Sequence, residues 1–236
     1  MNVIRQDIAA CMFLFSIVYI EKQKFWKYLL WCLIGSLFHK TALLLIFLYP
    51  ILKNGKDYFK SVSNQFFILF LFVIIYFTSF NVDTLIQPLI YFFTELMHYN
   101  HVYIDSAIAK MSTDKTTGLG FILFTLLDVI FILNSNKLKE YYNTKRFTII
   151  YNIYYFGAIL QVLFANSYIL ARPFRYFRYF KLIMGAYLLY YLIKHGKPSN
   201  NLVYFIIIVS IYLLLFGAIF YTGDINKYTY LFFWQK

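Results

Sequence analysis

The sequence predicts an all-α protein: a polytopic bundle of transmembrane helices with about eight membrane segments. The first observation is composition, because 61% of the 236 residues are hydrophobic and only 14% are charged, which lies outside the range of soluble globular domains. The second is that the apolar residues gather in long runs separated by short polar connections. The third is that most lysines lie in those connections, which is typical of membrane proteins.

The net charge of +12 at pH 7 would indicate a nucleic-acid partner in a soluble protein. Here the basic residues flank apolar runs, so the charge reflects membrane topology and predicts no nucleic-acid binding. Cys11 and Cys32 lie inside apolar runs without metal-ligand spacing, and we interpret them as small apolar side chains. The chain has no glycine-rich phosphate loop, and we expect neither a cofactor nor a metal.

The first predicted membrane segment is residues 8–20. It is not a signal peptide, because Asp7 offsets Arg5 and no small-residue cleavage site follows. Since roughly 20 residues are needed to cross a bilayer, residues 1–7 must extend this span and place Arg5 in the outer half of the membrane. Runs that are too short either include flanking polar residues or are half-helices buried in protein. The other apolar runs, in chain order, are residues 25–38, 41–52, 66–80, 118–133, 147–171, 182–193 and 202–221.

Residues 25–52 are predicted to form a short hairpin with His39 at its tip. The basic residues of four connections then fall on one side of the membrane, which is the cytoplasmic side. Residues 81–117 form an outer loop, and residues 1–236 make a single integral membrane domain. The basic residues in question are Lys22, Lys24, Lys27, Lys53, Lys56, Lys60, Lys137, Lys139, Lys145, Arg146, Lys194 and Lys197.

Residues 172–181, Arg-Pro-Phe-Arg-Tyr-Phe-Arg-Tyr-Phe-Lys, hold three of the five arginines, and we call them the arginine segment. Four cations this close need an anion, and no acidic residue lies between residues 160 and 197. The segment therefore predicts a site for an anion, which is either a ligand or a lipid head group. Pro173 favours the start of a helix here. The alternative is a basic aromatic belt that anchors the protein to lipid head groups.

Arg5 and Asp128 are ionisable residues inside predicted membrane segments, and such residues are functional candidates by default. Arg5 is either a functional cation or the structural partner of Asp7 or Asp128. Asp128 is either the partner of Arg5, which we favour, or a proton acceptor. His39 is either an orienting group or a base, or it caps the turn of the hairpin.

The outer loop carries Glu95-x-x-His98-x-x-His101-x-x-x-Asp105, a spacing that would place these side chains near one face of a helix. Residues 85–108 are predicted as an amphipathic helix on the outer surface. Its polar face has three interpretations: a general base among Glu95, His98 and Asp105, a metal site, or a solvated surface. The spacing matches no standard zinc motif.

Two short motifs and one repeated triplet resemble a known family. Residues 2–9, Asn-Val-Ile-Arg-Gln-Asp-Ile-Ala, and residues 36–42, Ser-Leu-Phe-His-Lys-Thr-Ala, are similar to motifs of the EpsG family. These are Wzy-like polymerases of bacterial exopolysaccharide and O-antigen repeat units. The Arg-Tyr-Phe triplets of residues 175–180 also resemble the family, whereas the residues flanking His39 depart modestly from it. In the family the first motif follows several earlier spans, so we expect this chain to match the C-terminal portion and to lack the N-terminal spans.

The resemblance implies polymerisation of undecaprenyl-diphosphate-linked oligosaccharide repeat units for exopolysaccharide, capsule or O-antigen, on the outer face of the bacterial cytoplasmic membrane. A complete chain would be a multi-pass membrane glycosyltransferase, with lipid-linked oligosaccharide, membrane lipids and other polysaccharide export proteins as partners. The expected diphosphate-binding residues are Arg5, Arg172, Arg175 and Arg178. The expected catalytic residues are His39, Glu95 and His98. Two alternatives stay open: a transporter or flippase of lipid-linked sugars, and an inactive or partner-dependent fragment of a polymerase.

Overall fold

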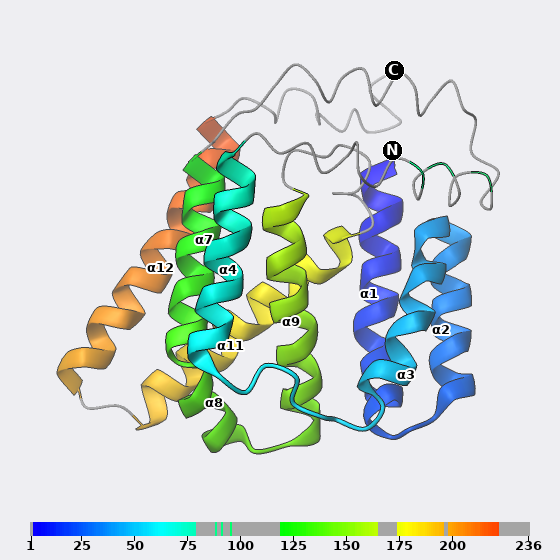
Figure 1. Cartoon of the computed structure of the whole chain (residues 1–236), viewed down its shortest axis with the longest axis horizontal. Coiled ribbons are helices and arrows are strands. Elements are labelled where there is room, and N and C mark those ends of the chain that lie inside the picture. The colour runs from blue at the N-terminus through cyan, green and yellow to red at the C-terminus, as the bar shows by residue number, and fades with distance from the viewer. Residues whose placement is uncertain are drawn as a thin grey trace, which may run out of the picture.

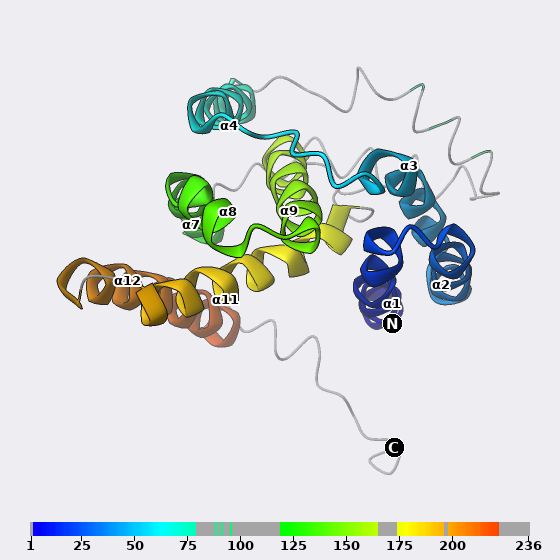
Figure 2. The ribbon, with the colours of Figure 1, turned by 90° about the horizontal axis from the view of Figure 1, so that it is seen from below.

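The computed structural model describes residues 2–78, 88, 91, 95, 119–164, 174–195 and 198–221. Within these residues the protein is all-α, with nine α-helices and two 3₁₀ segments. This confirms the predicted secondary-structure class. The helices lie side by side in one bundle with α9 near its middle (Figure 1). The view from below shows α1, α2 and α3 on one side of α9, with α7, α8 and α12 on the other (Figure 2).

The first two helices, α1 (Asn2–Glu21) and α2 (Phe25–Phe38), run antiparallel (Figure 1). The turn between them is tight because Gln23 adopts a left-handed backbone conformation with φ of 54°. Near the other end of α2, a Cβ added to Gly35 would make ordinary van der Waals contact with the Cβ of Ala42, at 3.4 Å. The backbone of α2 at Gly35 therefore lies directly beside the segment that follows it.

The chain turns back on itself after α2. His39 is extended, with φ of −148° and ψ of 114°, and the returning arm is the 3₁₀ helix η1 (Lys40–Phe47) followed by α3 (Leu48–Leu52). The returning arm packs against α2. The structure thus contains the two arms of the hairpin expected over residues 25–52, with His39 between them.

Four helices form the middle of the described chain. Side-chain caps start two of them: the Ser61 hydroxyl accepts the N–H of Asn64, and the Thr144 hydroxyl accepts the N–H of Phe147. One helix, α8, lies where the sequence predicted a polar connection, because apolar runs alone do not reveal a short polar helix. The four helices are α4 (Val62–Phe77), α7 (Leu119–Leu133), α8 (Ser135–Tyr142) and α9 (Lys145–Leu163).

The first of the last two described helices begins within the arginine segment. A single 3₁₀ turn, η2 (Arg175–Phe177), leads directly into α11 (Arg178–His195), which is followed by α12 (Pro198–Tyr221). Helix α11 runs obliquely across the bundle, from the neighbourhood of α1 to the start of α12 (Figures 1 and 2). The first turn of α11 can therefore contact both α1 and α7.

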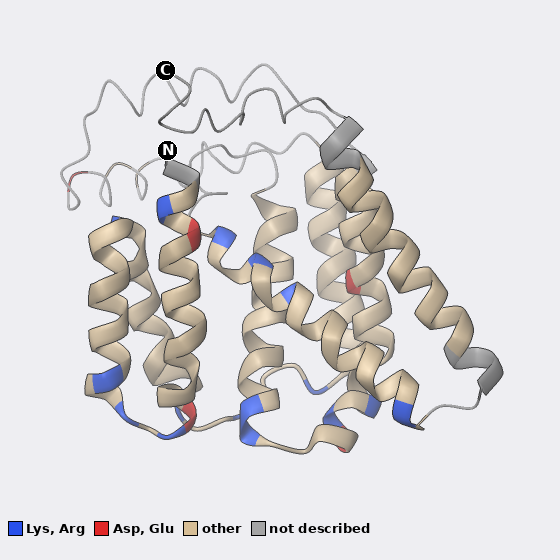
Figure 3. Ribbon diagram, turned by 180° about the vertical axis from the view of Figure 1, so that it is seen from behind, with Lys and Arg blue, Asp and Glu red and all other residues tan. Residues whose placement is uncertain are grey.

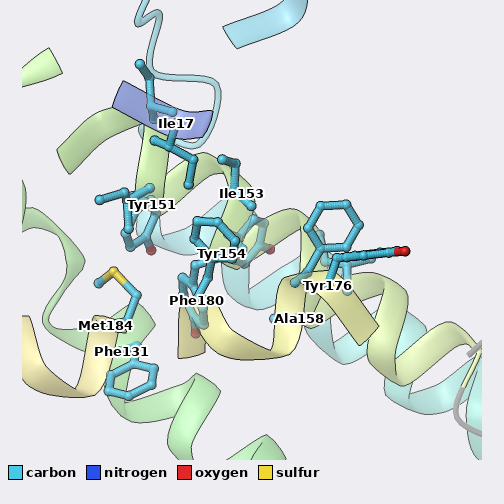
Figure 4. Packing of buried hydrophobic residues seen from close by; sticks show 14 of the residues in the cluster. Ile17, Phe131, Tyr151, Ile153, Tyr154, Ala158, Tyr176, Phe180 and Met184 are labelled. Carbon is cyan, nitrogen blue, oxygen red and sulfur yellow. The ribbon is translucent and has the colours of Figure 1, made fainter. Parts of the chain in front are cut away.

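The core is centred on α9 and is rich in aromatic side chains. Tyr151 and Tyr154 of α9 lie close to Phe180 and Met184 of α11 and to Phe131 of α7 (Figure 4), and each of these five residues is at most 1% exposed. Aromatic side chains bury large apolar areas and dominate packing energies. Helices α7, α9 and α11 are therefore held together as one packed unit.

Large apolar side chains also cover outward faces of the bundle: Trp26 is 78% exposed, Leu37 84% and Phe67 65%. Exposed apolar faces of this size suit a lipid environment. Within the described residues, however, no single helix has both the length and the hydropathy of a membrane span. Helices α7 and α8 meet these criteria only as a pair, with a bend of 56° between them. The membrane-spanning bundle of about eight segments therefore stays a prediction.

The basic connections gather at one end of the bundle (Figure 3). There the Arg146 Nε lies 2.7 Å from Glu21 Oε2, and the Lys139 Nζ lies 3.0 Å from Asp57 Oδ2. These pairs join the end of α1 to α9, and the chain after α3 to α8. We call this region the basic end. The described basic connections thus lie on one side, as the orientation argument requires, and the membrane face that this side meets stays a prediction.

Candidate functional site

The arginine segment lies where α11 begins, away from the basic end (Figure 3). The structure describes it from Phe174 onward, so Arg172 and Pro173 lie outside the described residues. Arg175 is half-buried and Arg178 is exposed. The Arg-Tyr-Phe triplet repeats every three residues, and each residue type in it has a different role.

The phenylalanines hold the segment in the core. Phe177 and Phe180 are buried, and their rings lie 6.3 Å and 5.6 Å from the ring of Phe13 on α1. On the opposite side, a Cβ added to Gly157 of α9 would lie 2.3 Å from the Cβ of Phe177. Glycine at this position therefore permits a close approach between α9 and the start of α11.

Tyr176 joins the segment to the tip of the hairpin. Its buried side chain places the hydroxyl 3.1 Å from the Thr41 hydroxyl and 3.4 Å from Nδ1 of His39. The Thr41 hydroxyl is itself 2.7 Å from the same Nδ1. The backbone of His39 caps α2, because its N–H donates to the carbonyl of Gly35. Capping is thus carried out by the backbone, and the imidazole meets Thr41 and Tyr176.

Tyr179 joins the segment to the first motif. Its hydroxyl donates to Oδ1 of Asp7 at 2.7 Å. Asp7 also attracts the Arg178 guanidinium, which Arg175 repels. On the same turn of α1, Gln6 is buried and Arg5 is exposed. The first motif and the arginine segment are therefore in direct contact through Asp7.

Asp128 forms a buried ion pair with Lys181, the last residue of the arginine segment. The Lys181 Nζ lies 2.8 Å from Asp128 Oδ2, and the two side chains are 3% and 2% exposed. The prediction that Asp128 pairs with Arg5 is wrong, because α11 packs against α7 and brings Lys181 to it, whereas Arg5 is exposed on α1. One of the four cations of the segment thus already has a carboxylate.

The outer-loop candidates are hardly described. Glu95 is an exposed helical residue, and His98, His101 and Asp105 lie outside the described residues. In the part of the chain that is described, no group of three or more His, Cys, Asp or Glu side chains is arranged to hold a metal ion. The catalytic roles of Glu95 and His98 therefore stay predictions.

Sequence reasoning missed Thr41, Tyr176, Tyr179 and the partner of Asp128. The signal for the tyrosines was present, since a triplet that repeats with a period of three turns by about 60° per repeat on a helix. Each residue type then keeps its own sector of the helix, and the tyrosines lie between the sector of the arginines and that of the buried phenylalanines. The signal for Asp128 was absent, because nothing in the sequence indicates which cation meets a buried carboxylate.

Among the described residues, no carboxylate lies within ion-pair distance of Arg175 or Arg178. Asp7 accepts from Tyr179 and Asp128 pairs with Lys181, so these two guanidiniums are the candidates for binding an anion. Planar guanidiniums bind phosphate oxygens in pairs. Tyr176 joins the segment to the imidazole of His39, a side chain of the acid–base type. Two neighbouring cations joined to an acid–base side chain are the groups that transfer chemistry with a phosphate leaving group requires.

A family model described as the EpsG family matches residues 1–232. No curated protein and no solved structure matches the chain.

Proposed function

The chain belongs to the EpsG family, which is linked to exopolysaccharide biosynthesis, and from this premise we propose that it polymerises lipid-linked glycans. The substrates are oligosaccharide repeat units on undecaprenyl diphosphate. The growing glycan is transferred from its carrier to a hydroxyl of the next unit, and the lipid diphosphate leaves. The product is exopolysaccharide, capsule or O-antigen.

The observation that carries this proposal is the convergence of three segments far apart in the sequence. Tyr179 contacts Asp7 of the first motif, and Tyr176 contacts Thr41 and His39 of the second. These are the segments on which the sequence resemblance to the family rested, together with the arginine segment itself. Residues that meet in space from separate motifs are expected where a substrate is bound.

In the proposal the positively charged arginines stabilise the diphosphate leaving group. As the glycosidic bond breaks, negative charge grows on the diphosphate, and fixed cations stabilise that charge more than they stabilise the ground state. Arg175 and Arg178 bind the diphosphate through their planar forks. Arg5 and Arg172 are further diphosphate-binding residues in the proposal, Arg5 because it precedes Asp7 on α1 and Arg172 because it begins the arginine segment.

His39 acts on the acceptor sugar. Its Nδ1 lies 2.7 Å from the Thr41 hydroxyl and 3.4 Å from the Tyr176 hydroxyl, and these partners hold the ring in one orientation. As a general base, the imidazole takes the proton of the attacking hydroxyl. Glu95 and His98 of the outer loop are the other candidates for this step.

The reaction takes place on the outer face of the cytoplasmic membrane in this proposal. Two observations support it: the described basic connections meet at one end of the bundle, and the arginine segment lies away from that end (Figure 3). Positively charged connections favour the cytoplasmic side. Exposed apolar side chains on α2 and α4 support the membrane location.

The buried Lys181–Asp128 pair is the observation that favours a transporter or flippase of lipid-linked sugars. Transporters carry charged groups near the membrane midplane, at the interface of internal repeats. The sequence shows no clear inverted repeat, and a polymerase remains the better supported function. The two functions differ in whether substrate must cross a membrane, which the experiment below exploits.

The test is polymerisation by the full chain purified in detergent, where no translocation is required, with lipid-linked repeat units extracted from the host cell. We expect the wild-type protein to form polymer. Arg175→Ala and Arg178→Ala should each slow it by about 10- to 100-fold, the loss expected for a charge-assisted hydrogen bond. Arg146→Ala, the matched control at the basic end, should stay within about twofold.

Two results would overturn the proposal. One is a wild-type protein that is folded and supplied with repeat units yet forms no polymer, which is the result expected of a transporter. The other is equal polymer formation by the two arginine-segment variants and the wild-type protein.

A further inference from the structure

The buried ion pair of Lys181 and Asp128 has no part in the proposed reaction. Its burial is nevertheless costly, because both charges leave water and need full compensation by hydrogen bonds. Lys181 lies one helical turn from Arg178 on α11, and Asp128 reaches it from α7. The protein therefore buries an ion pair, at a cost in folding free energy, next to a proposed substrate-binding residue.

The hydrogen bonds of Lys181 are saturated. An ammonium group has three N–H donors, and Lys181 has three acceptors: Oδ2 of Asp128 at 2.8 Å, Oε1 of Gln161 at 3.2 Å and the carbonyl of Phe124 at 3.3 Å. The other carboxylate oxygen of Asp128 accepts from Tyr154 at 2.9 Å. Lys181 thus has no donor left for a phosphate. This indicates that it fixes α11 against α7 and α9 and does not bind a ligand.

Helix α7 contacts the first turn of α11 at two points on one face. Phe124 and Asp128 are four residues apart on α7, and Arg178 and Lys181 are three residues apart on α11, so each pair shares a helix face. The ring centre of Phe124 lies 5.0 Å from the Lys181 Nζ and 5.9 Å from the Arg178 Cζ. One aromatic ring therefore contacts the buried cation and the exposed cation together.

A third contact fixes the backbone at the same place. The Tyr212 hydroxyl of α12 donates to the carbonyl of Lys181 at 3.2 Å, and a Cβ added to Gly185 would lie 2.5 Å from that hydroxyl oxygen. Side chains from α7, α9 and α12 thus surround one turn of α11. The rotation of this turn about its axis is therefore closely determined.

We propose that Phe124 and Asp128 are positioning residues for Arg178. Asp128 sets the rotation of α11 by holding Lys181, and the face of the Phe124 ring orients the Arg178 guanidinium toward the lipid diphosphate. This inference rests on the proposed function, because it takes the diphosphate as the ligand of Arg178. Neither positioning residue touches the substrate.

The main test is binding of a short-chain polyprenyl diphosphate to the full chain purified in detergent. Phe124→Leu keeps the backbone carbonyl that Lys181 uses but removes the aromatic face, and we expect binding about threefold to tenfold weaker. Phe124→Tyr keeps an aromatic face and should bind like the wild-type protein. Leu126→Ala changes an exposed residue of the same helix and is the matched control, with unchanged binding.

Kinetics separate positioning from a general loss of structure. In polymerisation assays Phe124→Leu should lower kcat and kcat/KM for the lipid-linked unit, because Arg178 acts mainly on the charge that grows on the leaving diphosphate, and should leave the thermal midpoint close to the wild-type value. The double variant Asp128→Leu with Lys181→Met removes both buried charges together, so no unpaired charge burdens the fold. It should accumulate like the wild-type protein and bind the diphosphate at least about tenfold more weakly.

Arg178→Ala in the same titration distinguishes the two proposals. Weaker binding by Arg178→Ala, with wild-type binding by Phe124→Leu and by the folded double variant, overturns the positioning roles alone. Wild-type binding by Arg178→Ala overturns the diphosphate-binding role of that arginine, and with it the proposed function.

Discussion

The basic end and the arginine segment both concentrate positive charge, and they differ in what the nearby carboxylates do. At the basic end, Glu21 pairs with Arg146 and Asp57 pairs with Lys139. At the arginine segment, Asp7 accepts from a neutral tyrosine, and Asp128 accepts from Lys181 and not from an arginine. Positive charge alone thus does not indicate an anion site. An anion site is indicated where the neighbouring carboxylates accept hydrogen bonds from groups other than the arginines.

The two regions also differ in exposure. The Arg146–Glu21 pair is open to solvent, with side chains 48% and 26% exposed, whereas the Lys181–Asp128 side chains are 3% and 2% exposed. An exposed pair adds little to stability, and a buried pair is costly to break. The same kind of substitution should therefore lower the free energy of unfolding more in the buried pair than in the exposed pair.

The largest difference is expected for removal of one partner from each ion pair. Asp128→Asn leaves the Lys181 charge buried without a carboxylate, which should lower the free energy of unfolding by about 3–5 kcal/mol. Glu21→Gln should change it by about 0–1 kcal/mol. Thermal midpoints in detergent and protein levels in membranes measure both. Similar stability of the two variants would contradict the structural importance of the buried pair.

The second difference is expected for two tyrosine hydroxyls. Tyr179→Phe releases Asp7, which then neutralises the nearby Arg178, and polyprenyl diphosphate binding should weaken about tenfold. Tyr58→Phe removes a hydroxyl that donates to the carbonyl of Ile51 near the basic end, and binding should not change. Titration of the purified variants measures both affinities. Unchanged binding by Tyr179→Phe would show that Asp7 does not control the charge of the site.

The smallest difference is expected for two threonine hydroxyls. Thr41→Val removes a partner of His39 Nδ1, and kcat should fall about fivefold with KM unchanged, since a neutral hydrogen bond is worth about 1 kcal/mol. Thr148→Val removes a hydroxyl that donates to the Thr144 carbonyl within α9, and should leave kcat intact. Steady-state polymerisation kinetics provide the measurement. A rise in KM alone for Thr41→Val would argue against a proton-transfer role for His39.

Periodicity and hydropathy predicted the features that depend on local sequence. The all-α class, the break of the hairpin at His39 and the helix start within the arginine segment all follow from short stretches of chain. So does the clustering of basic connections, because each lies between two apolar runs. The short helix α8 was missed since its sequence is polar, although Leu138 is buried.

Features that depend on tertiary packing were not predictable in this way. Asp128 and Lys181 are separated by 53 positions and Tyr179 and Asp7 by 172, so their contacts depend on how α11 crosses the bundle. The sequence shows four cations in the arginine segment, and it cannot show which one is already neutralised. The sequence therefore gives only a set of candidate cations. Packing separates Lys181, which is buried against Asp128, from the arginines that remain candidates for the anion.

The central claim is that the arginine segment binds a diphosphate and the basic end does not. The most direct measurement is the affinity of the purified full chain for a short-chain polyprenyl diphosphate, compared between Arg178→Lys and Arg146→Lys. We predict a loss of at least about tenfold for Arg178→Lys, because lysine lacks the planar fork, and wild-type affinity for Arg146→Lys. Equal affinities in the two variants would contradict the claim.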